Sequence, residues 1–203
     1  MKKIITITAS RSEFGILKNI IFQLSNSKKI KNKLIVTGSH LSDKFGKTMG
    51  EIEELKIKNI LKMKINMGKT SSKNSSIIGS NLIRMFGNFL NKTKIDAVIL
   101  FGDRFEILAI AYACFLFKIP ILHIGGGETT HGSNDESIRH AVSKLSSFHF
   151  VTHKIHKKRL IQLGEKKSRV FIIGSPGIEN IRKTKFFSKK YIEKKFNFKF
   201  KKK

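Results

Sequence analysis

Short apolar runs rich in β-branched residues alternate with longer helical patterns along this chain, and no other feature constrains the fold as strongly. Seven runs have the composition of strands, at 3–9, 34–37, 57–67, 95–101, 121–124, 148–152 and 170–173. Strands separated by helices require crossover connections. We therefore expect an α/β fold, a doubly wound and mainly parallel sheet with helices on both faces.

Apolar residues at helical spacing predict the helices between these runs. A helix is expected from Phe14 onward, and others at 42–55, 77–90 and 105–117. Two more are expected to end at Leu145 and Leu163. The polar stretch 70–76 (TSSKNSS) is expected to be a loop.

The stretch 120–140, PILHIGGGETTHGSNDESIRH, combines a buried strand, three glycines and several acids. Glu128 follows the glycines, and Asp135 and Glu136 open the next helical pattern. Ligands of open α/β sheets bind outside the carboxyl ends of the strands. The stretch therefore predicts a site. The alternative is a glycine turn followed by an ordinary acidic helix N-terminus.

Two other strands end in charged residues. Asp103 and Arg104 follow the run at 95–101, and Arg11 follows the first run, with Gly15 in the helix after it. An arginine beside a helix N-terminus favours a phosphate. Taken singly, Asp103 also suits a helix N-cap and Arg11 a surface position. The dinucleotide-binding motif GxGxxG is absent.

The sequence motifs of metal-dependent and serine-nucleophile catalysis are absent. None of the seven histidines has metal-ligand spacing, and the nucleophile motif GxSxG does not occur. His131 lies in the presumed site loop, whereas His149, His153 and His156 are expected to be structural or solvent-facing. Cys114 is the single cysteine, so no disulfide can form. We expect acid and arginine chemistry with no metal and no cofactor.

The net charge of +27 raises the question of a nucleic-acid partner. Lysines scattered over the chain carry most of it, and only 182–203 forms a cluster, with eleven basic residues and Glu193. We favour a solvated surface and expect no specific nucleic-acid or membrane partner. The N-terminus resembles a strand more than a signal peptide, and the run 107–117 is too short to span a bilayer. A cytoplasmic location is the default expectation.

Five blocks of sequence together resemble one family. They are SRSEFG (10–15), VTGSHLSDKFGKT (36–48), FGDRFE (101–106), HIGGGETTHGSNDESIRHAVSKLSSFHF (123–150) and RLIQLGEKKSRVFIIGSPGIENI (159–181). In order and spacing they resemble the UDP-N-acetylglucosamine 2-epimerases, particularly the hydrolysing branch that releases N-acetylmannosamine for sialic-acid-type sugars.

The resemblance implies the N-terminal half of a two-domain GT-B fold. Residues 1–181 correspond to the first domain, and 182–203 is a basic segment leading toward a second domain that this sequence lacks. That second domain would supply a histidine and the loops that hold most of the uridine diphosphate. A homodimer is expected for the full-length form, and little activity for this half alone.

The resemblance also implies site residues. Asp103, Glu128 and Asp135 fall on the family's three acid positions, with the base and the acid left unassigned. Nucleotide contacts are implied for Arg11, Gly15 and Arg104, and less directly for His131 and Arg139. Arg139 has a second interpretation, in which it holds Asp135 in place. Some relatives have a lysine at the position of Ile16, so the phosphate contacts here are expected to be fewer.

Several functions remain open on the sequence. The first is conversion of UDP-N-acetylglucosamine to N-acetylmannosamine and UDP by elimination of UDP and addition of water. The second is the same reaction on a UDP-N,N'-diacetylbacillosamine substrate. The third is a non-catalytic remnant or binding module whose working surface is the basic tail. A GT-B glycosyltransferase is disfavoured by the GDRFE and DESIRH blocks.

Overall fold

A single sheet of parallel strands organises the computed structural model, which describes residues 1–46, 48–69 and 71–201. Its strand order is β3-β2-β1-β4-β5-β6-β7, and every neighbouring pair is parallel. This confirms the expected doubly wound topology. The strands are β1 (Lys2–Thr8), β2 (Ile30–Val36), β3 (Ile60–Lys62), β4 (Ala97–Phe101), β5 (Ile121–Ile124), β6 (Phe148–Val151) and β7 (Val170–Ile172).

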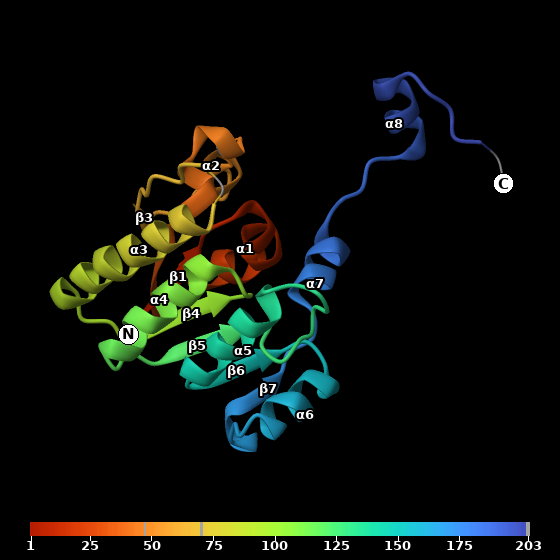
Figure 1. Cartoon of the computed structure of the whole chain (residues 1–203). Coiled ribbons are helices and arrows are strands. Elements are labelled where there is room, and N and C mark those ends of the chain that lie inside the picture. The colour runs from red at the N-terminus through yellow and green to blue at the C-terminus, as the bar shows by residue number, and fades with distance from the viewer. Residues whose placement is uncertain (47, 70, 202–203) are drawn as a thin grey trace.

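Helices cover both faces of the sheet (Figure 1). They are α1 (Arg11–Ser25), α2 (Met49–Glu53), α3 (Ser72–Lys92), α4 (Phe105–Leu116), α5 (Asp135–Leu145), α6 (Lys154–Gln162), α7 (Pro176–Lys183) and α8 (Lys189–Phe196). Helices α3, α4 and α5 pack on one face, whereas α1 and α2 pack on the other. Helix α7 lies against α1.

The core has two layers because successive side chains of a strand point to opposite faces. In β4, Val98 and Leu100 belong to the cluster beneath α3 and α4, while Ile99 belongs to the cluster beneath α1. Phe86 of α3 and Leu17 of α1 are fully buried on their respective sides. The central strands therefore read as continuous apolar runs, as expected for a sheet that is covered twice.

The helix expected at 42–55 is wrong for most of its length. One 3₁₀ turn, Gly38–Leu41, comes just before this range and a second, Asp43–Phe45, lies within it, and α2 covers only Met49–Glu53. Gly46 ends the second turn with a φ of 80°, in the left-handed region that an α-helix cannot continue through. A glycine thus interrupts a pattern that periodicity alone presents as one helix.

The expected loop at 70–76 is largely wrong as well. Residue 70 lies outside the described residues, and Ser72–Lys92 is helical from its first residue. Ser71 caps this helix, and its hydroxyl accepts a hydrogen bond from the backbone N–H of Asn74 at 3.1 Å. Serines favour the N-cap because their side chains satisfy an unpaired N–H. The polar run is thus the beginning of α3.

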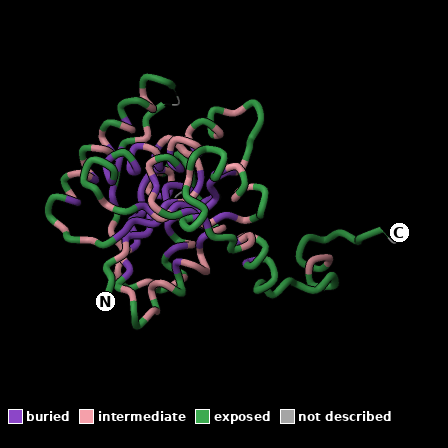
Figure 2. Tube along the Cα trace, turned by 90° about the horizontal axis from the view of Figure 1, so that it is seen from below, coloured by how far each residue is buried: buried purple, intermediate pink, exposed green. Residues whose placement is uncertain are grey.

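The chain beyond α7 extends away from the sheet as an arm carrying α8 (Figure 1). The arm is exposed along nearly all of its length (Figure 2). Its ring contacts are made within the arm, between Phe187 and Tyr191 and between Phe198 and Phe200. Within the described residues, no helix combines the length and apolar character needed to cross a membrane.

Candidate functional site

Four adjacent strands, β1, β4, β5 and β6, end on the same edge of the sheet, and the residues that follow them form the candidate site. The parallel pairing places all four carboxyl ends at this edge, which we call the carboxyl rim. Asp103 follows β4, Glu128 follows the glycines after β5, and Thr152 follows β6. The topology therefore gathers residues that are far apart in sequence.

Arg139 of α5 connects two of the loops at the carboxyl rim. Its guanidinium donates hydrogen bonds to the Asp103 carboxylate, to the backbone oxygen of Glu128 at 3.0 Å and to Thr130 Oγ1 at 3.0 Å. The residue is buried, with 6% of its surface exposed. Arg139 thus holds Asp103 and the Glu128 loop together. The carboxylate that Arg139 contacts is therefore that of Asp103, whereas the second interpretation from the sequence named Asp135.

His123 of β5 also contacts the backbone of the loop that carries Asp103. The imidazole Nε2 lies 2.9 Å from the backbone oxygen of Gly102, and Nδ1 lies 3.2 Å from Ser143 Oγ. Burial lowers the pKa of His123 to about 4, so the ring is neutral at pH 7. Because a carbonyl only accepts, Nε2 carries the proton. His123 therefore fixes the backbone just before Asp103.

Arg104 lies between two buried carboxyl groups. Its Nη2 and Nε donate to Glu106 at 2.8 and 3.2 Å, and its Nε lies 3.9 Å from Glu13 Oε1. Burial opposes the charge of Arg104, but Glu106, Glu13 and Asp135 together raise its pKa. The Arg104 charge, for which the resemblance implies a nucleotide contact, is therefore already partly balanced by protein carboxyl groups.

Glu13 closes a capping box at the start of α1. Its Oε2 accepts from the backbone N–H groups of Ala9 at 2.7 Å and Ser10 at 3.2 Å. Burial raises the pKa of Glu13 to about 7, although the two backbone donors and Arg104 act in the opposite direction. A titratable carboxyl thus lies beneath Arg104 at the carboxyl rim.

Glu128 has its own partners. Its Oε1 accepts a hydrogen bond from Thr152 Oγ1 at 2.9 Å, and that hydroxyl lies 2.8 Å from Nδ1 of His156 in α6. Arg159, one turn further along α6, donates to the backbone oxygen of Gly127. Helix α6 therefore holds both the backbone and the side chain of this loop.

The other expected site residues lie outside this network. Asp135 is the exposed first residue of α5, and it acts on Arg104 through its charge. His131 is exposed in the loop before α5. Arg11 pairs with Glu51 at 2.6 Å and lines a separate hollow of about 480 Å³ between α1 and α2. The backbone oxygen of Gly15 accepts a hydrogen bond from Asn180 of α7 at 2.7 Å.

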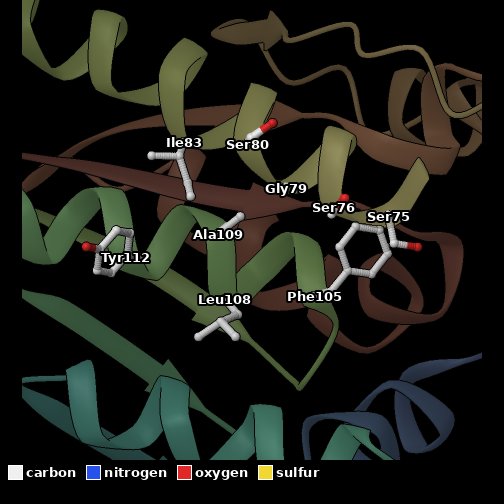
Figure 3. A pocket seen from close by; sticks show the side chains of 9 residues that line it. All are labelled: Ser75, Ser76, Gly79, Ser80, Ile83, Phe105, Leu108, Ala109 and Tyr112. Atoms are coloured by element: carbon white, nitrogen blue, oxygen red, sulfur yellow. The ribbon is translucent and has the colours of Figure 1, made fainter. Parts of the chain in front are cut away.

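A larger hollow of about 590 Å³ lies between α3 and α4 (Figure 3). Its lining is serine, glycine and apolar residues, among them Ile83, Leu108 and Tyr112. Its described lining residues include no carboxylate and no arginine for acid–base chemistry. Among residues 1–46, 48–69 and 71–201, no group of three histidine, cysteine, aspartate or glutamate side chains could hold a metal ion.

Several residues of the network were not singled out from the sequence. Glu13 lies in an S-x-x-E pattern, which is the signature of a capping box and could have identified it. Glu106 lies within the FGDRFE block, and Thr152 directly follows a strand. His123 gave no local signal, because its partner Gly102 is distant in sequence and only the sheet brings the two together. His156 lies four residues after its partner Thr152, but its approach to Glu128 depends on the sheet.

The sheet and its carboxyl rim define the chain as a doubly wound α/β protein with a carboxylate–arginine site at the ends of parallel strands. Comparison with known proteins identifies the family. A family profile described as UDP-N-acetylglucosamine 2-epimerase matches residues 23–203. The chain belongs to the UDP-N-acetylglucosamine 2-epimerase family.

Two curated relatives align over nearly the whole of this chain. A Campylobacter jejuni protein named GDP/UDP-N,N'-diacetylbacillosamine 2-epimerase (hydrolyzing) is 43% identical over 95% of this chain and 50% of its own length. The polysialic acid biosynthesis protein P7 of Escherichia coli is 39% identical over 97% of this chain and 50% of its own length. The chain therefore spans about half the length of the curated relatives it matches.

Solved structures show the same fold. The UDP-GlcNAc 2-epimerase from Neisseria meningitidis bound to UDP-GlcNAc superposes with a TM-score of 0.76 at 25% identity, covering 89% of this chain and 48% of that one. A Listeria monocytogenes protein superposes with a TM-score of 0.81 at 19% identity, covering 96% and 51%. The expected fold class, one half of a GT-B protein, is confirmed.

Proposed function

We propose that this chain forms one half of a hydrolysing UDP-sugar 2-epimerase that converts UDP-N-acetylglucosamine to N-acetylmannosamine and UDP. The observation that carries the proposal is the Arg139 contact, which joins the Asp103 loop to the Glu128 loop at the carboxyl rim. The names of the relatives support the reaction class, since two of them are called hydrolyzing 2-epimerases.

The proposed reaction has two stages. A base removes the proton from C2 while the C1–O bond breaks, its electron pair leaves with UDP, and a C1=C2 double bond forms. Water then adds to C1, and an acid delivers a proton to C2 from the opposite face. Carboxyl groups in unequal surroundings suit these opposite roles. In this proposal Asp103, Glu128 and Asp135 provide the carboxyl groups, and Arg104 and Arg11 balance the charge of the leaving diphosphate.

A UDP-N,N'-diacetylbacillosamine is the second candidate substrate. It is favoured by the relatives from Campylobacter jejuni and Legionella pneumophila, at 43% and 36% identity, which carry that substrate in their names. A Neisseria meningitidis relative at 34% identity is named UDP-N-acetylglucosamine 2-epimerase. Both candidates share the chemistry at C1 and C2 and differ in the substituents at C4 and C6.

Asp103→Asn is the substitution that tests the proposed function. We would replace the matching half of the Campylobacter jejuni relative with this chain and measure UDP released from UDP-N-acetylglucosamine. The substitution should lower kcat by about a hundredfold or more, because general acid–base groups contribute rate factors of about that size. The 203-residue chain alone should turn over little substrate, since half of the cleft would be open to water.

Asp96→Asn provides the matched control. Asp96 precedes β4 at the opposite end of the strand, where it accepts hydrogen bonds from Lys2 and from the backbone of Lys3. Its replacement should leave UDP release unchanged. Full activity of Asp103→Asn would contradict the proposal. Absence of a thermal shift with UDP together with tight polyanion binding would favour the non-catalytic alternative instead.

A further inference from the structure

Three side chains, from the loop after β5, the residue after β6 and helix α6, form a continuous hydrogen-bonded row beside the carboxyl rim. Thr152 Oγ1 lies 2.9 Å from Glu128 Oε1 and 2.8 Å from His156 Nδ1, and Nδ1 lies 3.8 Å from the same carboxylate oxygen. Thr152 directly follows β6, and His156 lies in the first turn of α6. The hydroxyl is therefore the link between the carboxylate and the imidazole.

The chemistry of the three groups fixes the direction of the row. An ionised carboxylate only accepts hydrogen bonds, so the single hydroxyl proton of Thr152 points to Glu128. Thr152 Oγ1 must then accept from His156, which requires a proton on Nδ1. The geometry thus selects the Nδ1–H form of the imidazole and leaves Nε2 as the nitrogen that gains or loses a proton.

The backbone around the row is rigidly placed. Gly127 has a φ of 75°, and a Cβ at this position would lie 2.5 Å from the backbone oxygen of His156. Arg159 donates to the backbone oxygen of the same glycine. The first turn of α6 therefore packs directly on the turn that carries Glu128, which places His156 beside the carboxylate.

Only one of the two Glu128 oxygens takes part. Within the described part of the chain, Oε2 makes no hydrogen bond or ion pair, and 37% of the side chain is exposed. A carboxylate held through one oxygen and open at the other has the arrangement of a proton-transferring group oriented by its neighbours.

We infer that Thr152 and His156 are positioning residues that hold Glu128 through Oε1 and present Oε2 to the ligand. This inference rests on the proposed function for its catalytic consequence, whereas the hydrogen-bonded row itself is testable on this chain alone. The sequence predicted a structural or solvent-facing histidine at position 156, and this inference gives that structural role a specific content.

The direct test is nitrogen NMR of the 203-residue chain with labelled histidine. His156 should show a protonated Nδ1 and an unprotonated Nε2 when neutral. Thr152→Val, which is close in shape, should abolish this preference, and Thr152→Ser should restore it because the hydroxyl returns. A neutral His156 protonated at Nε2 in the unaltered chain, or an Nδ1–H form that survives in Thr152→Val, would overturn the inference.

A charge test uses the titration of His156. Burial lowers the pKa of His156 and Glu128 raises it, while Arg159, His153 and Arg139 add smaller lowering effects. Glu128→Gln should therefore shift the His156 titration to lower pH. Glu165→Gln is the matched control, because Glu165 bonds His149 at 3.0 Å and should move that histidine instead. An unmoved His156 in Glu128→Gln would count against the row.

The catalytic consequence is measured in the same hybrid enzyme used for Asp103. Thr152→Val should lower kcat by about tenfold with little change in KM, since a misplaced reacting group costs rate more than binding. Thr152→Ser should recover most of that loss. An inactive hybrid whose row is intact by NMR would contradict the proposed function alone. If the hybrid is active and Thr152→Val leaves its kcat unchanged, that result would contradict the positioning role but not the proposed function.

Discussion

At the scale of a single residue, burial and hydrogen bonding have opposite effects on the pKa of Glu13. The side chain is almost fully buried, yet it accepts two backbone hydrogen bonds and lies 3.9 Å from Arg104. Burial dominates and raises its pKa to about 7 from 4.5. The native state therefore retains a proton between about pH 4.5 and 7, where the unfolded chain has lost it. Stability consequently falls as the pH rises through this window.

Glu13→Gln should remove this pH dependence. The amide keeps an oxygen for the backbone donors of the capping box but cannot ionise. Relative to the variant, the unaltered chain should lose of the order of 3 kcal/mol of unfolding free energy across the window. Denaturant titrations at several pH values provide the measurement. Glu53→Gln, at an exposed position, is the control. Parallel pH profiles of stability for the unaltered chain and Glu13→Gln would contradict the raised pKa of Glu13.

The turn between β5 and α5 shows how one element constrains another. Gly127 and Gly132 both have positive φ, 75° and 78°, but their surroundings differ. A Cβ at Gly127 would collide with the backbone oxygen of His156, whereas a Cβ at Gly132 would meet nothing within 4 Å. The first glycine is required by conformation and by packing, the second by conformation alone.

Replacement of each glycine by alanine separates these two effects. Gly132→Ala should cost about 1 kcal/mol of unfolding free energy, because a residue with a Cβ is strained in the left-handed conformation. Gly127→Ala should cost at least about 2 kcal/mol more, because α6 must move away from the turn. Urea unfolding of both variants measures the difference. Equal losses would show that α6 does not pack on Gly127 as described.

The elements themselves were predictable to different degrees. Strand β4 was clear from its apolar run, because a strand buried on both faces needs no alternation. The region 42–55 was not, since its periodicity was helical while Gly46 required a left-handed turn. The start of α3 was missed because serines favour both loops and helix N-caps, and only the hydrogen bond from Asn74 decides between them.

At the scale of the whole molecule, the chain is about half the length of its curated relatives. The resemblance implies that a second half would hold most of the uridine diphosphate, whereas the carboxyl groups proposed to act at C1 and C2 belong to this chain. The sugar ring would then lie against the carboxyl rim. The preference for sugar substituents should accordingly follow this chain.

Two hybrid enzymes test this division of roles. One would join this chain to the second half of the Campylobacter jejuni relative, and the other to that of the Neisseria meningitidis relative at 34% identity. Both should prefer the same substrate of the two, UDP-N-acetylglucosamine or UDP-N,N'-diacetylbacillosamine, by kcat/KM. Preferences that change with the second half would show that sugar selection lies there instead.

The sequence alone determined the order of strands and helices, the parallel sheet and the acids at its carboxyl ends. These follow from local apolar patterns and from the rule that parallel strands end at one edge. Only the tertiary structure decided which groups touch: Arg139 with Asp103, His123 with Gly102, and Thr152 with Glu128 and His156. Apart from the contact of Thr152 with His156, which lies within one unit, those contacts join residues from different crossover units. Their partners are set by how the strands are ordered across the sheet, which no local pattern records.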